Sequence, residues 1–243
     1  MTSQATTGGR AGTRHRTVRN LSVLAGIGYA VAWLVSLSVG APNLSVAASG
    51  RKVLAAYGGH GWSAMTMFVL AEGIAAIALA IIVVLAAGAA RRQGTPRAGL
   101  SAAGFGLAAA VVSWVELGMG AWLTFSVVPS GRAANAGTLN NAITRIDGGK
   151  MLLLAAMAVA LAALAAKSTV LPRWLAPLGL LLAVALVASG LGWVLLTNGL
   201  ATSVYVSGAL LIVFVAATGV TMGRRAGAAE AHAGRRHGSA ASR

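Results

Sequence analysis

Residues 63–90 read SAMTMFVLAEGIAAIALAIIVVLAAGAA, an apolar run in which Glu72 is the only charged side chain. A hydrocarbon core about 30 Å thick is crossed by roughly 20 apolar residues in a helix, so this run is long enough to span a membrane. Inside lipid each backbone donor and acceptor must be satisfied within its own segment, which favours an α-helix. The stretch therefore predicts a transmembrane helix that carries a carboxylate.

The composition extends this prediction to the whole chain. Apolar residues make up 57% of the sequence, charged residues 9%, and the mean hydropathy is +0.79, whereas soluble domains carry about 25% charged residues. The sequence has no cysteine, which excludes disulfides, thiol catalysis and cysteine-ligated zinc or iron–sulfur sites. Strand-type alternation is absent. We expect an all-α, polytopic membrane helix bundle of six transmembrane helices, with the other five near 21–40, 98–125, 151–166, 174–197 and 202–223; the fourth begins about a turn before 151.

The distribution of Lys and Arg predicts the orientation. Of the 19 basic residues, five lie in the loops after the first and third spans, and the others lie before span one, after span six and in the remaining loops. The positive-inside rule then places both termini in the cytoplasm. We expect a basic cytoplasmic tail over 1–20, the bundle over 21–223 and a disordered basic cytoplasmic tail over 224–243. A cleaved signal peptide is the alternative for span one.

Two intramembrane carboxylates are the main functional candidates. Glu72 lies 19 residues before Arg91, and Glu116 lies 19 residues after Arg97, so both lie about 28 Å from the inner surface along their helices. Because a short loop joins these two spans, we expect the helices to pack together, which allows the carboxylates to face one another; whether they touch stays open.

No Lys, Arg or His is expected at the depth of this pair, because Lys150 at the outer end of span four could reach water. Desolvation and like-charge proximity then predict that at least one carboxylate is protonated. A pair of this kind could bind a proton or a cation. It could equally be a neutral, hydrogen-bonded pair that holds helices together, and both interpretations stay open.

Residues of the outer loops are weaker candidates. His60, Asp147 and Lys150 could assist at the outer mouth; the alternatives are an interfacial histidine and an Asp147 that caps the start of span four. We expect no metal site and no cofactor. Residues 139–146 have helical spacing and predict a short helix on the outer membrane surface. A stripe of small residues on span one predicts helix packing, within the bundle or in a homo-oligomer; it comprises Gly28, Ala32, Ser36 and Gly40.

Several classes of function are disfavoured by the residues present. No span contains a histidine, which argues against an intramembrane serine protease, bis-histidine haem ligation and HExxH zinc chemistry. No catalytic residue is assigned. The net charge of +15 reflects the basic loops and tails, which could contact anionic lipid; no nucleic-acid partner is expected.

Four segments together resemble a known group of proteins. They are LAAYGGHGW (54–62), SWVELGMG (113–120), TLNNAITRIDGGKMLLL (138–154) and TVLPRWLAPLGLLLA (169–183). In this order they resemble six-helix bacterial integral membrane proteins, common in actinobacteria, of a family of unknown function. The resemblance implies a six-helix fold in the inner membrane of a bacterium and assigns no activity or residue.

The sequence therefore predicts a multi-pass membrane protein that is not an enzyme, either a small transporter-like bundle or a partner-binding bundle, with a carboxylate pair near the midplane. The alternatives are a structural or regulatory membrane subunit without a ligand path and, less favoured, an intramembrane enzyme that uses carboxylates.

Overall fold

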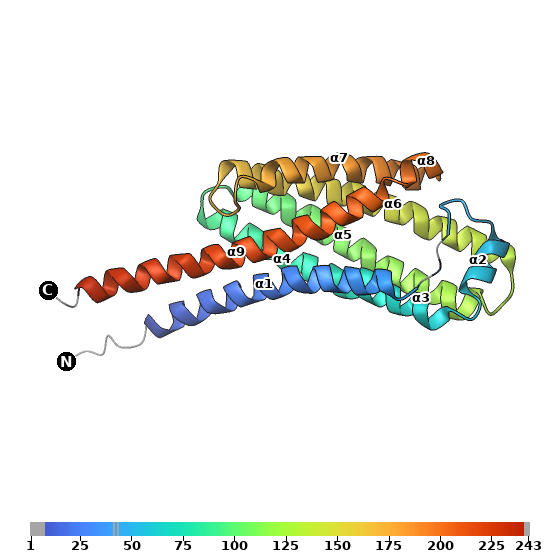
Figure 1. Cartoon of the computed structure of the whole chain (residues 1–243), viewed down its shortest axis with the longest axis horizontal. Helices are drawn as coiled ribbons and strands as arrows, with labels where there is room; N and C mark the ends of the chain where they lie inside the picture. Colours follow the sequence, from blue (N-terminus) through green and yellow to red (C-terminus); the bar gives the residue numbers. More distant parts are fainter. Residues whose placement is uncertain (1–7, 41, 43, 241–243) are drawn as a thin grey trace.

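A computed structural model describes residues 8–40, 42 and 44–240 of the chain. Helices make up its regular structure (Figure 1). In chain order these are α1 (Gly8–Ser38), α2 (Gly50–Tyr57), α3 (Gly61–Phe68), η1 (Val69–Ile74), α4 (Ala75–Arg92), α5 (Pro96–Trp122), η2 (Leu123–Val127), α6 (Ala133–Lys167), α7 (Leu175–Val194), α8 (Asn198–Ala201) and α9 (Val204–Ala240). The segments η1 and η2 are π-helical.

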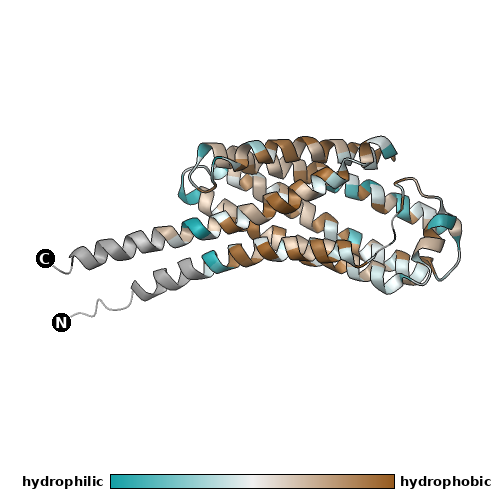
Figure 2. Cartoon of the chain, viewed as in Figure 1, coloured by the Kyte–Doolittle hydropathy of each residue, from teal (hydrophilic) through white to brown (hydrophobic). Residues whose placement is uncertain are grey.

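Within the described part of the chain, six stretches are long and apolar enough to cross a membrane, which confirms the prediction of an all-α, multi-pass membrane protein. They are Thr17–Ser38, Gly61–Arg92, Pro96–Val127, Ala133–Lys167, Leu175–Val194 and Asn198–Ala228. Figure 2 shows that hydrophobic residues dominate their middle parts and that hydrophilic residues gather toward their ends. With an even number of spans, the start of α1 and the end of α9 lie at the same end of the bundle (Figure 1).

Small residues let the helices pack closely. Helix α6 packs against both α5 and α7, while α1 packs against α9 and α4. A methyl group added to Gly148 of α6 would lie 2.8 Å from the carbonyl oxygen of Gly190 in α7. Contacts of this kind, between backbones without intervening side chains, are how membrane helices gain packing energy where lipid supplies no hydrophobic driving force.

The buried apolar residues form two clusters. The larger one fills the middle of the bundle and the end where α1 begins, and contains Ala75, Ile82 and Met151 among many others. The smaller one lies at the opposite end, where α2, α3 and η2 meet the first turns of α6, and contains Phe68 and Leu123. We call these the main core and the outer core.

Helix α6 differs from the sequence prediction. The expected surface helix over 139–146 and the fourth span are one continuous helix from Ala133 to Lys167. The reason is α2, which the sequence analysis did not predict and which packs on the first turns of α6. Asn140 and Thr144 are therefore buried, and the Thr144 hydroxyl donates to the Asn140 carbonyl oxygen (2.9 Å). Because α2 covers these turns, they continue along the axis of the membrane span and do not form a separate helix on the membrane surface.

The structure also shows where the terminal helices begin and end and which residues of the small-residue stripe are buried. Helix α9 continues to Ala240, through most of the segment expected to be disordered, and α1 begins at Gly8 within the expected basic tail. In the stripe on α1, Ala32 and Ser36 are buried inside the bundle, whereas Gly40 is exposed.

Candidate functional site

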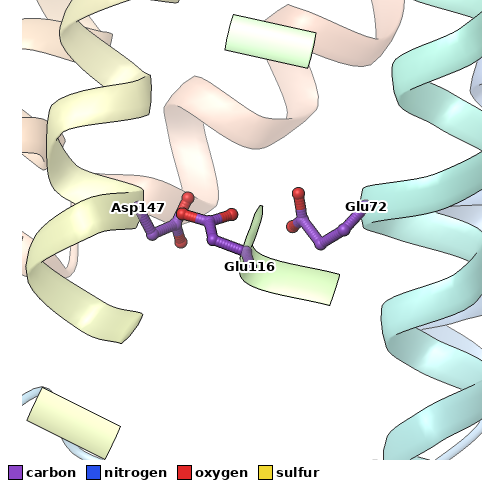
Figure 3. Close-up of side chains that lie close together, drawn as sticks. All are labelled: Glu72, Glu116 and Asp147. Atoms are coloured by element: carbon purple, nitrogen blue, oxygen red, sulfur yellow. The ribbon is translucent and has the colours of Figure 1, made fainter. Parts of the chain in front are cut away.

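Three carboxylates and one ammonium group meet inside the bundle. The Lys150 Nζ donates to Glu72 Oε2 at 2.7 Å and to Glu116 Oε2, and it lies 2.7 Å from Asp147 Oδ1. Figure 3 shows the three carboxylates converging from three spans: Glu72 from η1, Glu116 from α5 and Asp147 from α6. We call these four residues the charged cluster.

The charged cluster is shielded from solvent and lipid. The side chain of Lys150 is 7% exposed and that of Glu116 is 2% exposed; Glu72 and Asp147 are only slightly more open. Charged residues in the interior of a membrane protein are expensive and pair with one another. Because Lys150 contacts a carboxylate from each of three spans, one ammonium group ties η1, α5 and α6 together.

A glycine sets the distance between the two glutamates. Gly120 lies one helical turn from Glu116 and faces Phe68, which lies one turn from Glu72. A methyl group on Gly120 would lie 2.7 Å from the Phe68 ring. The absent side chain thus lets α5 approach the second span closely enough for both carboxylates to reach the same Lys150.

The local backbone around Glu72 is π-helical. In η1 the chain takes i→i+5 hydrogen bonds, and the Ala75 N–H bonds to the Leu70 carbonyl oxygen. Such segments are uncommon, and they occur frequently at functional sites because they turn a side chain away from its α-helical direction. Here the segment contains Glu72, which is buried toward α5 and α6 instead of facing lipid.

The charged cluster lies between the two apolar cores. On the second span Glu72 stands between Phe68 of the outer core and Ala75 of the main core. On α6 Lys150 directly precedes Met151 of the main core, while Leu139 belongs to the outer core. The cluster is therefore a polar layer across the bundle.

Formal charge does not balance in this layer. Three ionised carboxylates against one ammonium leave two negative charges uncompensated, and no other Lys or Arg among the described residues forms an ion pair with them. The Glu116 Oε1 atom is buried and has no hydrogen-bond partner among the described residues. An uncompensated buried charge costs several kcal/mol, so one or two additional positive charges would stabilise this arrangement.

Helix α1 closes the site on another side. Tyr29 of α1 is 3% exposed, and α1 packs against η1 and α4. The other buried tyrosine, Tyr57, belongs to the outer core, where burial raises its pKa to about 12. It therefore stays neutral in the physiological range.

The structure brings together most of the site residues named from the sequence. Glu72 and Glu116, which were expected at matching depths, both accept a hydrogen bond from Lys150. The prediction that no cation lies at their depth was wrong, because α6 extends outward beyond Lys150 and buries it. The capping role of Asp147 was wrong for the same reason: the helix begins at Ala133. His60 is exposed at the start of α3 and bonds only locally, to the Gly58 carbonyl oxygen.

One signal in the sequence could have identified the complete cluster. The chain has four acidic residues in total, and three of them converge on Lys150. In addition, Asp147 and Lys150 are an i,i+3 pair, which lies on one face of any helix that contains both.

The carboxylate oxygens also satisfy a simple distance criterion for a metal ion. One oxygen each from Glu72, Glu116 and Asp147 lies within 4.8 Å of the others. However, the Lys150 Nζ already lies between these oxygens. An ammonium at the centre occupies the place that a metal ion would need, so the geometry favours a proton as the additional positive charge.

A second polar cluster joins α7 to α9. The Ser189 Oγ lies 2.9 Å from both the Ser203 Oγ and the Ser207 Oγ. Each hydroxyl also has a backbone carbonyl partner on its own helix or turn. We call this the hydroxyl cluster; it is neutral, and all its members have partners.

Comparisons with protein families, with curated proteins and with solved structures find no match to this chain.

Proposed function

We propose that this chain is a small transporter-like membrane protein whose charged cluster binds and exchanges protons. The observation that carries the proposal is the charge imbalance: three buried carboxylates from three spans share one ammonium group. A proton is the smallest positive charge that can correct this imbalance, and the buried Glu116 Oε1, which has no hydrogen-bond partner among the described residues, could hold it.

The arrangement resembles the general design of proton-handling sites in membrane proteins, where ionisable residues inside spans mark proton or ion pathways. Each carboxylate that takes up a proton releases part of its hold on Lys150. Because the three carboxylates belong to η1, α5 and α6, protonation changes the attraction between spans. This couples proton binding to helix packing, which is what a transporter-like bundle requires.

Infrared spectroscopy of the full chain in lipid tests proton binding directly. A protonated carboxyl group has a C=O stretch that a carboxylate lacks. We expect such a band near neutral pH, its loss or shift in Glu116→Gln, and its shift after transfer to D₂O. Glu230→Gln is the matched control, because Glu230 is the only acidic residue outside the charged cluster. The absence of any cluster carboxyl band over the whole pH range in which the protein is folded would contradict the proposal.

Liposomes that contain a pH-sensitive dye test transport. Under an imposed potential we expect proton uptake with the wild-type chain and loss of uptake with Glu116→Gln, while Glu230→Gln retains it. A protonated band that does not exchange in D₂O, together with no uptake, would support the alternative of a structural or regulatory subunit. Stabilisation by Mg²⁺ or Ca²⁺ that disappears in Glu116→Gln would contradict the proton site and indicate a cation bound among the carboxylate oxygens, which lie within 4.8 Å of one another.

The location belongs to the same proposal. We infer a bacterial inner membrane with both termini in the cytoplasm, supported by the distribution of Lys and Arg and by the resemblance to six-helix actinobacterial membrane proteins of unknown function. Reporter fusions after Arg97 and after the last residue should behave as cytoplasmic, and fusions within 130–140 as extracytoplasmic. A periplasmic signal at the C terminus would contradict this orientation.

A further inference from the structure

A groove lies at the end of the bundle where α1 begins and α9 ends, away from the outer core. What it binds does not depend on the proposed proton site. Helices α1 and α9 lie side by side there and continue together beyond the other spans (Figure 1). An open groove of about 370 Å³ lies between them. It is lined by Arg19, Asn20, Val23, Leu24, Gly223 and Arg224.

Close packing of two glycines brings the arginines to one level. A methyl group on Gly223 would lie 2.9 Å from the Arg19 carbonyl oxygen, and one on Gly219 would meet the backbone of Ser22 and Gly26. The two helices therefore touch backbone to backbone at this point. Arg19 of α1 and Arg224 of α9 consequently line the same groove instead of facing separate surfaces.

Arg19 and Arg224 each bring a guanidinium group to the lining of this groove. Arg19 is oriented by a hydrogen bond from its Nε to the Asn20 side-chain oxygen (3.4 Å). The neighbouring Arg225 is directed elsewhere and donates to the Thr169 carbonyl oxygen.

The remaining lining residues are apolar and face outward. Leu24 is 67% exposed and lies just inside the span that begins at Thr17, while the last span ends at Ala228. The groove thus crosses the boundary between the hydrocarbon region and the headgroups. Figure 2 shows hydrophilic residues on both helices at this level, directly beside hydrophobic ones.

We propose that this groove binds an anionic phospholipid, with the phosphate between Arg19 and Arg224 and an acyl chain along Val23 and Leu24. Basic pockets between spans are the sites at which anionic headgroups bind, and the planar guanidinium group matches phosphate geometry. Two arginines beside exposed apolar residues fit a lipid better than a soluble phosphate, because a soluble phosphate has no acyl chain to contact Val23 and Leu24.

Native mass spectrometry of the full chain, released from neutral detergent with added phosphatidylglycerol or phosphatidylcholine, tests the proposal. The test variant is Arg19→Gln/Arg224→Gln. The matched control is Arg91→Gln/Arg92→Gln, which removes two exposed charges from the same end of the bundle. We expect about 30-fold weaker phosphatidylglycerol binding in the groove variant, little change in the control, and equal phosphatidylcholine binding in both.

Two results would overturn the lipid site. One is equal loss of phosphatidylglycerol binding in the groove variant and in the control, which would indicate general attraction to a basic surface. The other is displacement of the lipid by inorganic phosphate at equal concentration, which would indicate a soluble anion. If the double variant does not fold, Arg224→Gln alone changes an exposed residue and should weaken binding about fivefold; unchanged binding would again reject the site.

Discussion

The charged cluster and the hydroxyl cluster are both buried polar contacts between membrane helices, but their hydrogen bonds are completed in different ways. In the hydroxyl cluster each serine can give its single proton to a carbonyl oxygen within three or four residues or to a neighbouring hydroxyl, so each keeps a local acceptor if α7 and α9 separate. In the charged cluster Lys150 depends on residues 34 and 78 positions away. If one span moves, a charge loses its partner.

The two clusters lie on either side of one close helix contact. Gly148 of α6 lies between Asp147 and Lys150 in sequence, and the Gly190 of α7 that it touches follows Ser189. The charged cluster and the hydroxyl cluster differ in what they contribute to helix packing. A neutral cluster with local hydrogen-bond acceptors stabilises the helix contact only modestly, whereas under the proposed function the unbalanced charged cluster makes helix packing sensitive to protons. The predictions below test this contrast, from the largest expected effect to the smallest.

The first prediction concerns Lys150→Met, which removes the ammonium and leaves three buried carboxylates. We expect a loss of about 3–5 kcal/mol in the free energy of unfolding near neutral pH, measured by titration with a denaturing detergent. Acidification adds protons to the carboxylates and so reduces the loss. Lys52→Met on the exposed face of α2 is the control, with an effect within about 0.5 kcal/mol. Equal stability of Lys150→Met and wild type near neutral pH would show that the ammonium is not needed.

The second prediction concerns the contact between the clusters. Gly148→Ala places a methyl group 2.8 Å from the Gly190 carbonyl oxygen and from the Val194 nitrogen, both backbone atoms that cannot move alone. We expect a loss of about 1–3 kcal/mol by the same titration. In Gly149→Ala, by contrast, the added methyl group has no atom within 4 Å and should be neutral or slightly stabilising. Similar losses in the two variants would mean that helix propensity, and not the contact with α7, decides the effect.

The third prediction concerns the coupling of the two glutamates. Glu72→Gln and Glu116→Gln each remove a negative charge from a cluster that has an excess of them. Because both carboxylates bind one Lys150, their effects on stability should be non-additive, with an interaction energy on the order of 1 kcal/mol. A double-mutant cycle measures this energy. Strict additivity at neutral pH would mean that the two carboxylates do not share Lys150.

The fourth and smallest effect is expected in the hydroxyl cluster. Ser189→Ala removes the central hydroxyl, and polar contacts between membrane helices contribute about 0.6 kcal/mol on average. The loss should not depend on pH, because no member of the cluster titrates. Ser126→Ala, at an exposed position, is the control. A pH-dependent loss in Ser189→Ala would link the hydroxyl cluster to the charged one and weaken the contrast drawn here.

The sequence predicted the spans and placed Glu72 and Glu116 at matching depths on neighbouring helices, because hydrophobic length and a short connecting loop act locally. It did not predict the role of Lys150, because that role depends on α6 extending outward to Ala133. The extension in turn depends on α2, whose eight residues pack on α6 from a distant part of the chain. Polar residues such as Asn140 and Thr144 look like a membrane surface until α2 covers them. The sequence did not predict the hydroxyl cluster, because isolated serines in membrane spans have no spacing that indicates a contact between helices.

The π-helical turns have a consequence for how this chain can change over evolutionary time. A span with one π-helical turn is an α-helix that has accepted a single inserted residue, and α-helical residues are about 100° apart around the axis. Deleting one residue from Val69–Ile74 would restore an α-helix and rotate its outer part, with Phe68, relative to its inner part. Either Phe68 would lose its packing contact with Gly120, or Glu72 would lose its ion pair with Lys150. At this level a one-residue deletion is therefore more disruptive than most substitutions, and homologues that keep the charged cluster should keep the length of this segment.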